Sequence, residues 1–219
     1  MIRKWVILGG MGAAFLGTVF VANASADLRK LVDKARINYF NGREKPSHEA
    51  MALYEAGLKA AEEARVLAPT HADVLVWWAA NKGAIAELKK NLASLAAIRD
   101  IEKTMLIVLS QDPNYGFGAA DRVLGVLYHQ APGFVSIGSN NKAEKHLKRA
   151  MEIAPDFPGN RLAMAEFLFD QGEKESARKL VMPLVEDPRW REKDFGEFSL
   201  EKKDWEKRIV LWKPGGAFQ

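Results

Sequence analysis

The sequence predicts an all-α fold built from antiparallel helix hairpins. Apolar residues recur at the three- and four-residue spacing of amphipathic helices, whereas alternating strand-like runs are scarce. Near the C-terminal end, one helical pattern repeats after 34 residues, and a proline, Pro155 or Pro188, stops each copy. The matched positions are Ala143, Leu147, Ala150 and Met151 in the first copy and Ala177, Val181, Leu184 and Val185 in the second.

A 34-residue period with small residues at the helix contacts and a closing proline is typical of tetratricopeptide repeats. Leu124, Gly125 and Tyr128 lie at the offsets where the first helix of such a repeat carries Leu, Gly and Tyr. Earlier proline stops, at Pro69 and Pro113, are more widely spaced, which predicts a divergent α-solenoid with insertions. Because such arrays present extended binding surfaces, we expect a role in binding a partner.

The first 26 residues have the pattern of an export signal. Arg3 and Lys4 give a positive start, and the apolar run of 17 residues that follows ends at Val21. Small residues up to Ala26 suit a signal peptidase, so we expect cleavage after Ala26 and a periplasmic mature protein. The alternative is an uncleaved membrane anchor, since the run is at the short end of what crosses a bilayer.

Composition excludes several function classes. The chain has no cysteine, which excludes disulfides, thiolate metal sites, a cysteine nucleophile and a lipid-modified N-terminal cysteine. Without Arg3 and Lys4, the 32 basic residues fall to 30 against 28 acidic ones, a net charge of +2. Charges of both signs mix along every predicted helix and form no basic stripe, so no nucleic-acid partner is expected.

The mature chain is predicted to begin with three helices. The first, over residues 27–40, has one apolar face made of Leu28, Leu31, Val32, Ala35 and Tyr39. The second follows a cap at Ser47 and ends before Pro69, with a shared face of Met51, Tyr54, Leu58, Ala61 and Ala64. The third carries Trp77 and Trp78 and closes near Gly83. Residues 84–111 are predicted to be mostly helical, with a break near Lys90 or Asn91.

Two later segments depart from the repeat pattern. The loop that starts at Ala131 carries apolar Phe134, Val135 and Ile137, and it either folds back onto the repeats, which we favour, or meets a partner. Residues 189–219 are rich in aromatic side chains. A helix from about Leu200 to Trp212 would place two tryptophans and an isoleucine on one face: Trp205, Ile209 and Trp212. An end cap over the last repeat is favoured over a free docking tail. The chain thus divides into an export signal (1–26), a repeat domain (27–188) and an aromatic cap or tail (189–219).

From Ala50 to Pro188 the sequence resembles the TatT-type periplasmic T-component of tripartite ATP-independent periplasmic (TRAP) transporters. The resemblance is carried by "RVLGVLY", the "APGF" loop, "KAEKHLKRAMEIAP", "GNRL" and the earlier "WWAANKG". It implies degenerate tetratricopeptide hairpins, a pore or groove through the helices and an interaction with the solute-binding subunit of a transporter. Members are often lipoproteins, and this chain lacks the cysteine for that anchor.

No catalytic motif is recognisable, so we expect neither an enzyme nor a cofactor or metal site. The four histidines form no ligand-like pair and are interpreted as surface or loop residues: His48, His71, His129 and His146. Asn160 is interpreted as the N-cap of the helix that starts "RLAMAEFL".

Six residues are candidates to line a groove for a partner or ligand: Trp77, Trp78, Asn81, Arg122, Tyr128 and Phe134. Adjacent helical positions point about 100° apart, so one tryptophan can be buried while the other lines the groove; a core role for both is the alternative. Tyr128 is expected between helices, and Arg122 is either a surface charge or a groove residue.

The sequence therefore predicts an exported, non-enzymatic binding protein. The leading hypothesis is an accessory component of a TRAP-type transport system that docks a periplasmic solute-binding protein and holds an apolar ligand. The alternative is a scaffold for cell-envelope assembly with an envelope protein as partner. A second copy of the chain is a further candidate partner, and membrane contact is expected only through an uncleaved N-terminal segment.

Overall fold

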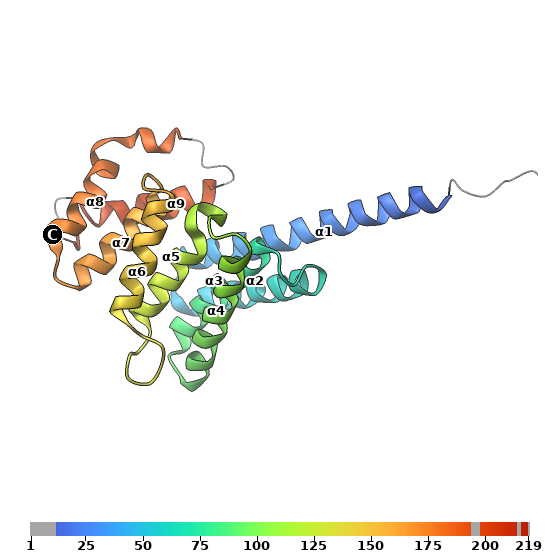
Figure 1. Cartoon of the computed structure of the whole chain (residues 1–219), viewed down its shortest axis with the longest axis horizontal. Helices are drawn as coiled ribbons and strands as arrows, with labels where there is room; N and C mark the ends of the chain where they lie inside the picture. The colour runs from blue at the N-terminus through green and yellow to red at the C-terminus, as the bar shows by residue number, and fades with distance from the viewer. Residues whose placement is uncertain (1–11, 194–197, 214–215, 219) are drawn as a thin grey trace, which may run out of the picture.

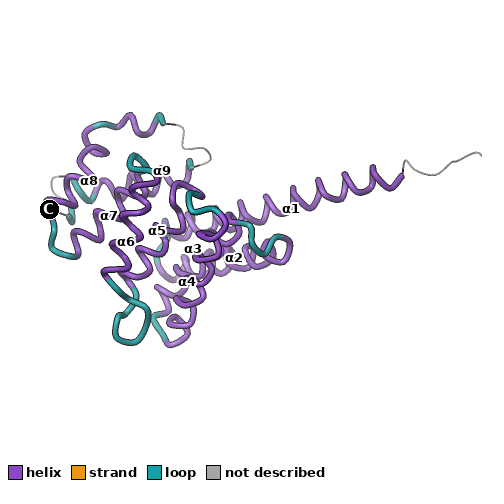
Figure 2. Tube along the Cα trace, viewed as in Figure 1, coloured by secondary structure: helices purple, strands orange, loops and turns teal. Residues whose placement is uncertain are grey.

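Helices make up most of the chain that the structure describes, which comprises residues 12–193, 198–213 and 216–218 of a computed structural model (Figure 1). Within these ranges no strand occurs, which confirms the all-α class (Figure 2). The elements are α1 (Gly12–Arg43), α2 (Ser47–Leu67), α3 (Ala72–Lys89), α4 (Leu92–Gln111), α5 (Tyr115–Gln130), α6 (Asn140–Ile153), α7 (Pro158–Asp170), α8 (Lys174–Glu186), the 3-10 turn η1 (Pro188–Arg191) and α9 (Ser199–Val210).

The helices pack as stacked hairpins. Each helix from α1 to α7 contacts its successor, and contacts between next neighbours join α1 to α3, α3 to α5 and α5 to α7. This pattern is that of a tetratricopeptide-like solenoid, as predicted. The last helix, α9, contacts α7 and α8 but also α1, so the end of the chain returns to its first hairpin.

The predicted repeat positions form the contact surfaces between helices. Ala143, Leu147 and Ala150 are buried on α6, and their counterparts 34 residues later are buried on α8: Ala177, Val181 and Leu184. Gly125 of α5 faces Leu147, and a Cβ at this glycine would lie only 2.5 Å from the Leu147 Cγ. The missing side chain therefore lets α5 and α6 approach closely.

Two predicted boundaries in the first half are wrong. α3 does not close near Gly83 but runs to Lys89, because the buried Ile85 and Ala86 keep the helix packed beyond the glycine. The predicted break near Lys90 or Asn91 is confirmed, since Lys90 is left-handed with φ 45° and Asn91 caps α4. Ser47 does not cap α2: it is the first helical residue, and no side-chain cap is present.

The aromatic C-terminal segment is a cap. Trp205, Ile209 and Trp212 are buried on one side of α9 and just beyond it, and Trp190 of η1 is buried as well. Burial of each such side chain contributes roughly 1.5–3 kcal/mol, so the segment stabilises the end of the array. Phe195 of the same segment lies outside the described residues.

The predicted export signal, residues 1–26, is described only from Gly12. From there the chain is helical without interruption to Arg43, so the predicted cleavage position after Ala26 lies inside α1. Figure 1 shows the N-terminal part of this helix projecting from the body of the protein. Among the described residues, no helix combines the length and apolar character needed to cross a membrane. Cleavage remains a prediction.

Candidate functional site

A cavity of about 1700 Å³ lies between the hairpins. The first helix of every hairpin contributes to its wall, together with α9: α1, α3, α5 and α7. Faces of α2 and α4 complete the lining. Pockets that bind drug-sized ligands measure about 300–1,000 Å³, so this space is large enough for a small-molecule ligand.

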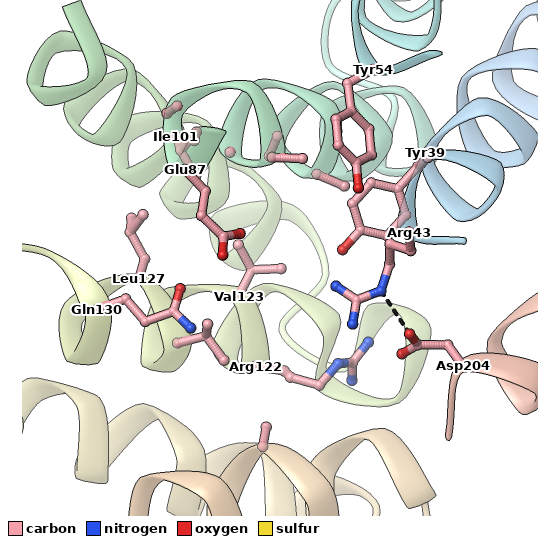
Figure 3. Close-up of a pocket in the computed structure, with 18 of the residues that line it drawn as sticks. Tyr39, Arg43, Tyr54, Glu87, Ile101, Arg122, Val123, Leu127, Gln130 and Asp204 are labelled. Carbon is pink, nitrogen blue, oxygen red and sulfur yellow. Dashed lines mark hydrogen bonds and ion pairs between the residues drawn. The ribbon is translucent and has the colours of Figure 1, made fainter. Parts of the chain in front are cut away.

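Part of the wall is apolar. Val123 and Leu127 line it from α5 and Ile101 lines it from α4 (Figure 3). Aromatic rings from two other helices add to this surface, with the Trp77 ring 6.0 Å from the Tyr39 ring and 5.7 Å from the Phe40 ring. This part of the cavity suits a hydrocarbon group.

Another part of the wall is charged, where α1 and α7 meet α9. Three arginine–carboxylate pairs cross it: Arg36 to Glu201 at 3.1 Å, Arg43 to Asp204 at 2.6 Å, and Arg208 to Glu166 at 2.8 and 2.9 Å. These pairs join the C-terminal cap to the first hairpin and to α7, and they set the polar character of the cavity.

Arg122 of α5 is a fourth guanidinium in this region, and Figure 3 shows it beside Arg43 and Asp204. Its Nη1 donates to the Asn160 Oδ1 at 2.7 Å and weakly to the Phe117 carbonyl at 3.4 Å. Burial, with the nearby Arg208 charge, lowers the pKa of Arg122 to about 10. The group therefore stays cationic at neutral pH.

An unusual turn at the start of α5 holds Arg122 in place. Gly116, Phe117 and Gly118 all have positive φ, and Phe117 at 58° is one of two such non-glycine residues in the described chain. The turn directs the Phe117 carbonyl towards the Nδ2 of Asn160, which donates to it at 3.0 Å. Such strained conformations cluster at functional sites.

Asn160 is not the N-cap of α7, so that interpretation is wrong. The helix begins at Pro158 after Phe157, and Asn160 is buried inside its first turn. Its amide donates to the backbone carbonyls of Ala150 and Ala154 at the end of α6 as well as to Phe117. The side chain thus ties three segments together behind Arg122.

Comparison with known proteins identifies the family. The family model described as "TRAP transporter T-component" matches residues 20–179, more than half of the chain. The chain belongs to this family. The resemblance seen in the sequence is thereby confirmed for a T-component.

Other comparisons give less. A solved structure described as a thermophilic TPR protein in Thermus thermophilus is similar at 16% identity and a TM-score of 0.39, covering 80% of this chain and 99% of that one. No curated protein matches the sequence.

The six predicted groove residues of the T-component occupy three different environments. Trp77 and Arg122 line the cavity. Trp78, Asn81 and Tyr128 are buried between helices, and Phe134 is fully exposed on the loop between α5 and α6. Two of the six predicted residues therefore line the same cavity.

The buried members have structural contacts. The Asn81 amide donates to the carbonyls of Ala35 at 3.1 Å and Trp77 at 2.8 Å, which links α3 to α1. Trp78 packs beneath the cations of Arg65 and Lys82, 4.7 and 4.3 Å from its ring. These contacts hold the wall of the cavity without lining it.

Two histidines are not ordinary surface residues, contrary to the sequence interpretation. The His146 Nδ1 lies 2.6 Å from the Oδ1 of buried Asp121, and its ring stacks on Tyr128. His129 lies 2.9 Å from an Asp170 oxygen and is mostly covered. Neither spacing is a motif in the sequence, because each pair joins different helices. In the described part of the chain, no group of three or more His, Asp or Glu side chains is placed so that it could hold a metal ion.

Proposed function

We propose that this T-component is an exported, non-enzymatic binding protein that docks a periplasmic solute-binding protein and holds an apolar ligand in its cavity. The cavity carries this proposal, because first helices from four hairpins and the cap surround one large, partly apolar space. Membership of a transporter family favours a transport partner over the envelope-assembly scaffold.

The loop between α5 and α6 supports a docking role beside the cavity. Ala131 and Pro132 line the cavity, while Phe134 and Val135, two and three residues further on, are exposed. Ile137 packs against the core, so the favoured fold-back holds for Ile137 but is wrong for Phe134 and Val135. An exposed aromatic ring next to a cavity edge suits a protein interface, where aromatic residues are enriched.

A periplasmic pull-down with the tagged full chain tests this proposal. We expect it to recover a solute-binding protein, and we expect F134A to reduce the recovery severalfold, because truncation of a central interface aromatic costs more than about 1 kcal/mol. V66S is the matched control, since Val66 is an exposed apolar residue on α2. Recovery of no solute-binding protein would count against docking, and sequencing of the mature N-terminus would test export.

A further inference from the structure

The charged wall of the cavity carries one more cation than it has carboxylates to pair. Where α1 and α7 meet α9, four arginines line the cavity beside three carboxylates: Arg36, Arg43, Arg122 and Arg208 beside Glu166, Glu201 and Asp204. Glu166, Glu201 and Asp204 each accept from another arginine, as described above. In the described chain, no carboxylate oxygen lies within 4.0 Å of Arg122. Arg122 is thus a half-buried cation that no carboxylate contacts directly.

The hydrogen bonds of two arginines show which atoms are free. Arg208 donates from its Nε and Nη2 to the two carboxylate oxygens of Glu166, which makes a bidentate pair. In Arg122 only the Nη1 donates, to the Asn160 Oδ1 and the Phe117 carbonyl, and its Nε and Nη2 donate to no described residue. The Nε and Nη2 groups, which bind a carboxylate in Arg208, therefore have no partner among the described residues in Arg122.

Neutral groups position this guanidinium and do not cancel its charge. Asn160 and Phe117 hold one end through amide oxygens, and the Phe157 ring lies 5.0 Å from the guanidinium carbon. Removing a cation from water without a counter-ion is costly, so such an arrangement is retained where a bound anion offsets the cost.

The apolar part of the wall begins beside Arg122. Val123 and Leu127 follow it along α5, and Figure 3 shows Ile101 of α4 across the space from them. An occupant with its anionic group at Arg122 would therefore lay its body against hydrocarbon side chains. The surplus is one charge, and Asp204 and Glu201 lie close by, so a singly charged head group fits better than a dianion.

We propose that Arg122 binds the carboxylate of an amphipathic organic acid through its Nε and Nη2, with the hydrocarbon body along α5. The inference rests on the proposed role of the cavity as a ligand site and adds the chemical class of that ligand. A bidentate arginine–carboxylate pair in a partly dry site is among the stronger charge-assisted contacts in proteins.

Calorimetric titration of the full chain, freed of co-purifying lipid, tests the head group. Dodecanoate and dodecanol share a hydrocarbon chain and differ in charge. We expect dodecanoate to bind at least tenfold more tightly than dodecanol, and acetate, which lacks the body, to bind far more weakly. Equal affinity for dodecanoate and dodecanol would overturn the proposal, and so would tighter binding of dodecyl phosphate than of dodecanoate.

Substitution of the arginine tests the position. R122Q keeps an amide donor for Asn160 but removes the charge and the fork, so the preference for dodecanoate over dodecanol should disappear. R149Q is the control, because Arg149 is an exposed cation on α6 outside the cavity lining. An unchanged preference in folded R122Q would overturn the assignment to Arg122. If R122Q does not fold, the dodecanoate and dodecanol affinities of the unmodified chain still decide the head group.

The pull-down separates this inference from the docking role. Recovery of a solute-binding protein together with no dodecanoate preference would overturn the carboxylate site and leave docking intact. A dodecanoate preference that depends on Arg122, without any recovered solute-binding protein, would support the site and count against docking.

Discussion

The two faces of α5 bury side chains in opposite ways. Towards α6, Leu124 and Tyr128 are buried and Gly125 brings the backbones into contact. Towards the cavity, Arg122, Val123 and Leu127 are only half-buried and border open volume. The face towards α6 is close-packed and holds the hairpin together, whereas the face towards the cavity borders open volume and carries the charge of Arg122. Stability thus depends on one face of the helix, and the proposed ligand site lies on the other.

The largest expected effect compares leucines on the two sides. L147A on α6 removes a fully buried side chain opposite Gly125 and should lower the free energy of unfolding by about 3 kcal/mol, since no neighbour can fill the hole. L127A borders the cavity already and should cost about 1 kcal/mol. Urea denaturation of both variants measures the difference, and equal losses would contradict the distinction between the faces.

A glycine pair sharpens the same comparison. G125A places a Cβ against Leu147 and should destabilise the protein by about 1–3 kcal/mol through overpacking. G83A, inside α3 at the cavity wall, meets only the Ile101 Cδ1 at 3.6 Å. It should stabilise the protein by about 0.5–1 kcal/mol, because alanine is the better helix former. The shift in thermal midpoint should therefore have opposite signs in the two variants.

The contact face of α5 could be predicted from the sequence and the cavity face could not. Leu124, Gly125 and Tyr128 follow a spacing that depends only on local helix geometry, and the 34-residue repeat places their partners on α6. The cavity brings together residues from seven helices in the described chain, and its ion pairs join residues up to 165 positions apart. No local pattern encodes such pairs. Arg122 was a candidate only through its place beside the repeat motif.

Local signals also failed where tertiary packing replaced them. Asn160 has the residue type of an N-cap, yet its amide is used across α6 and the turn at Phe117. Gly83 has the residue type of a helix end, yet buried neighbours carry α3 past it. In both cases the energy of contacts with other helices exceeds a local preference of about 1 kcal/mol.

The smallest expected effect concerns the pH dependence of Glu201, at the meeting of the cap and α1. Burial raises the pKa of this carboxyl above its ordinary value of 4.5, against the opposing attraction of Arg36. Above pH 4.5 the unfolded chain loses this proton before the native protein does, so the contribution of Glu201 to stability falls as pH rises and is lost once the native group ionises.

E201Q isolates this contribution, because glutamine keeps an oxygen for Arg36 and does not titrate. The stability of E201Q relative to the unmodified protein should therefore increase with pH from 4.5 upward and then level off. Thermal midpoints of both proteins across this range measure the difference. D187N serves as the opposite case at lower pH: the Arg189 side chain lowers the pKa of Asp187 from its ordinary 3.8 to about 2. Its exposed pair should therefore favour the native state increasingly as pH rises from about 2 to 4, and should add nothing further above that range. A falling E201Q difference would show that Arg36, and not burial, dominates at the junction between cap and first helix.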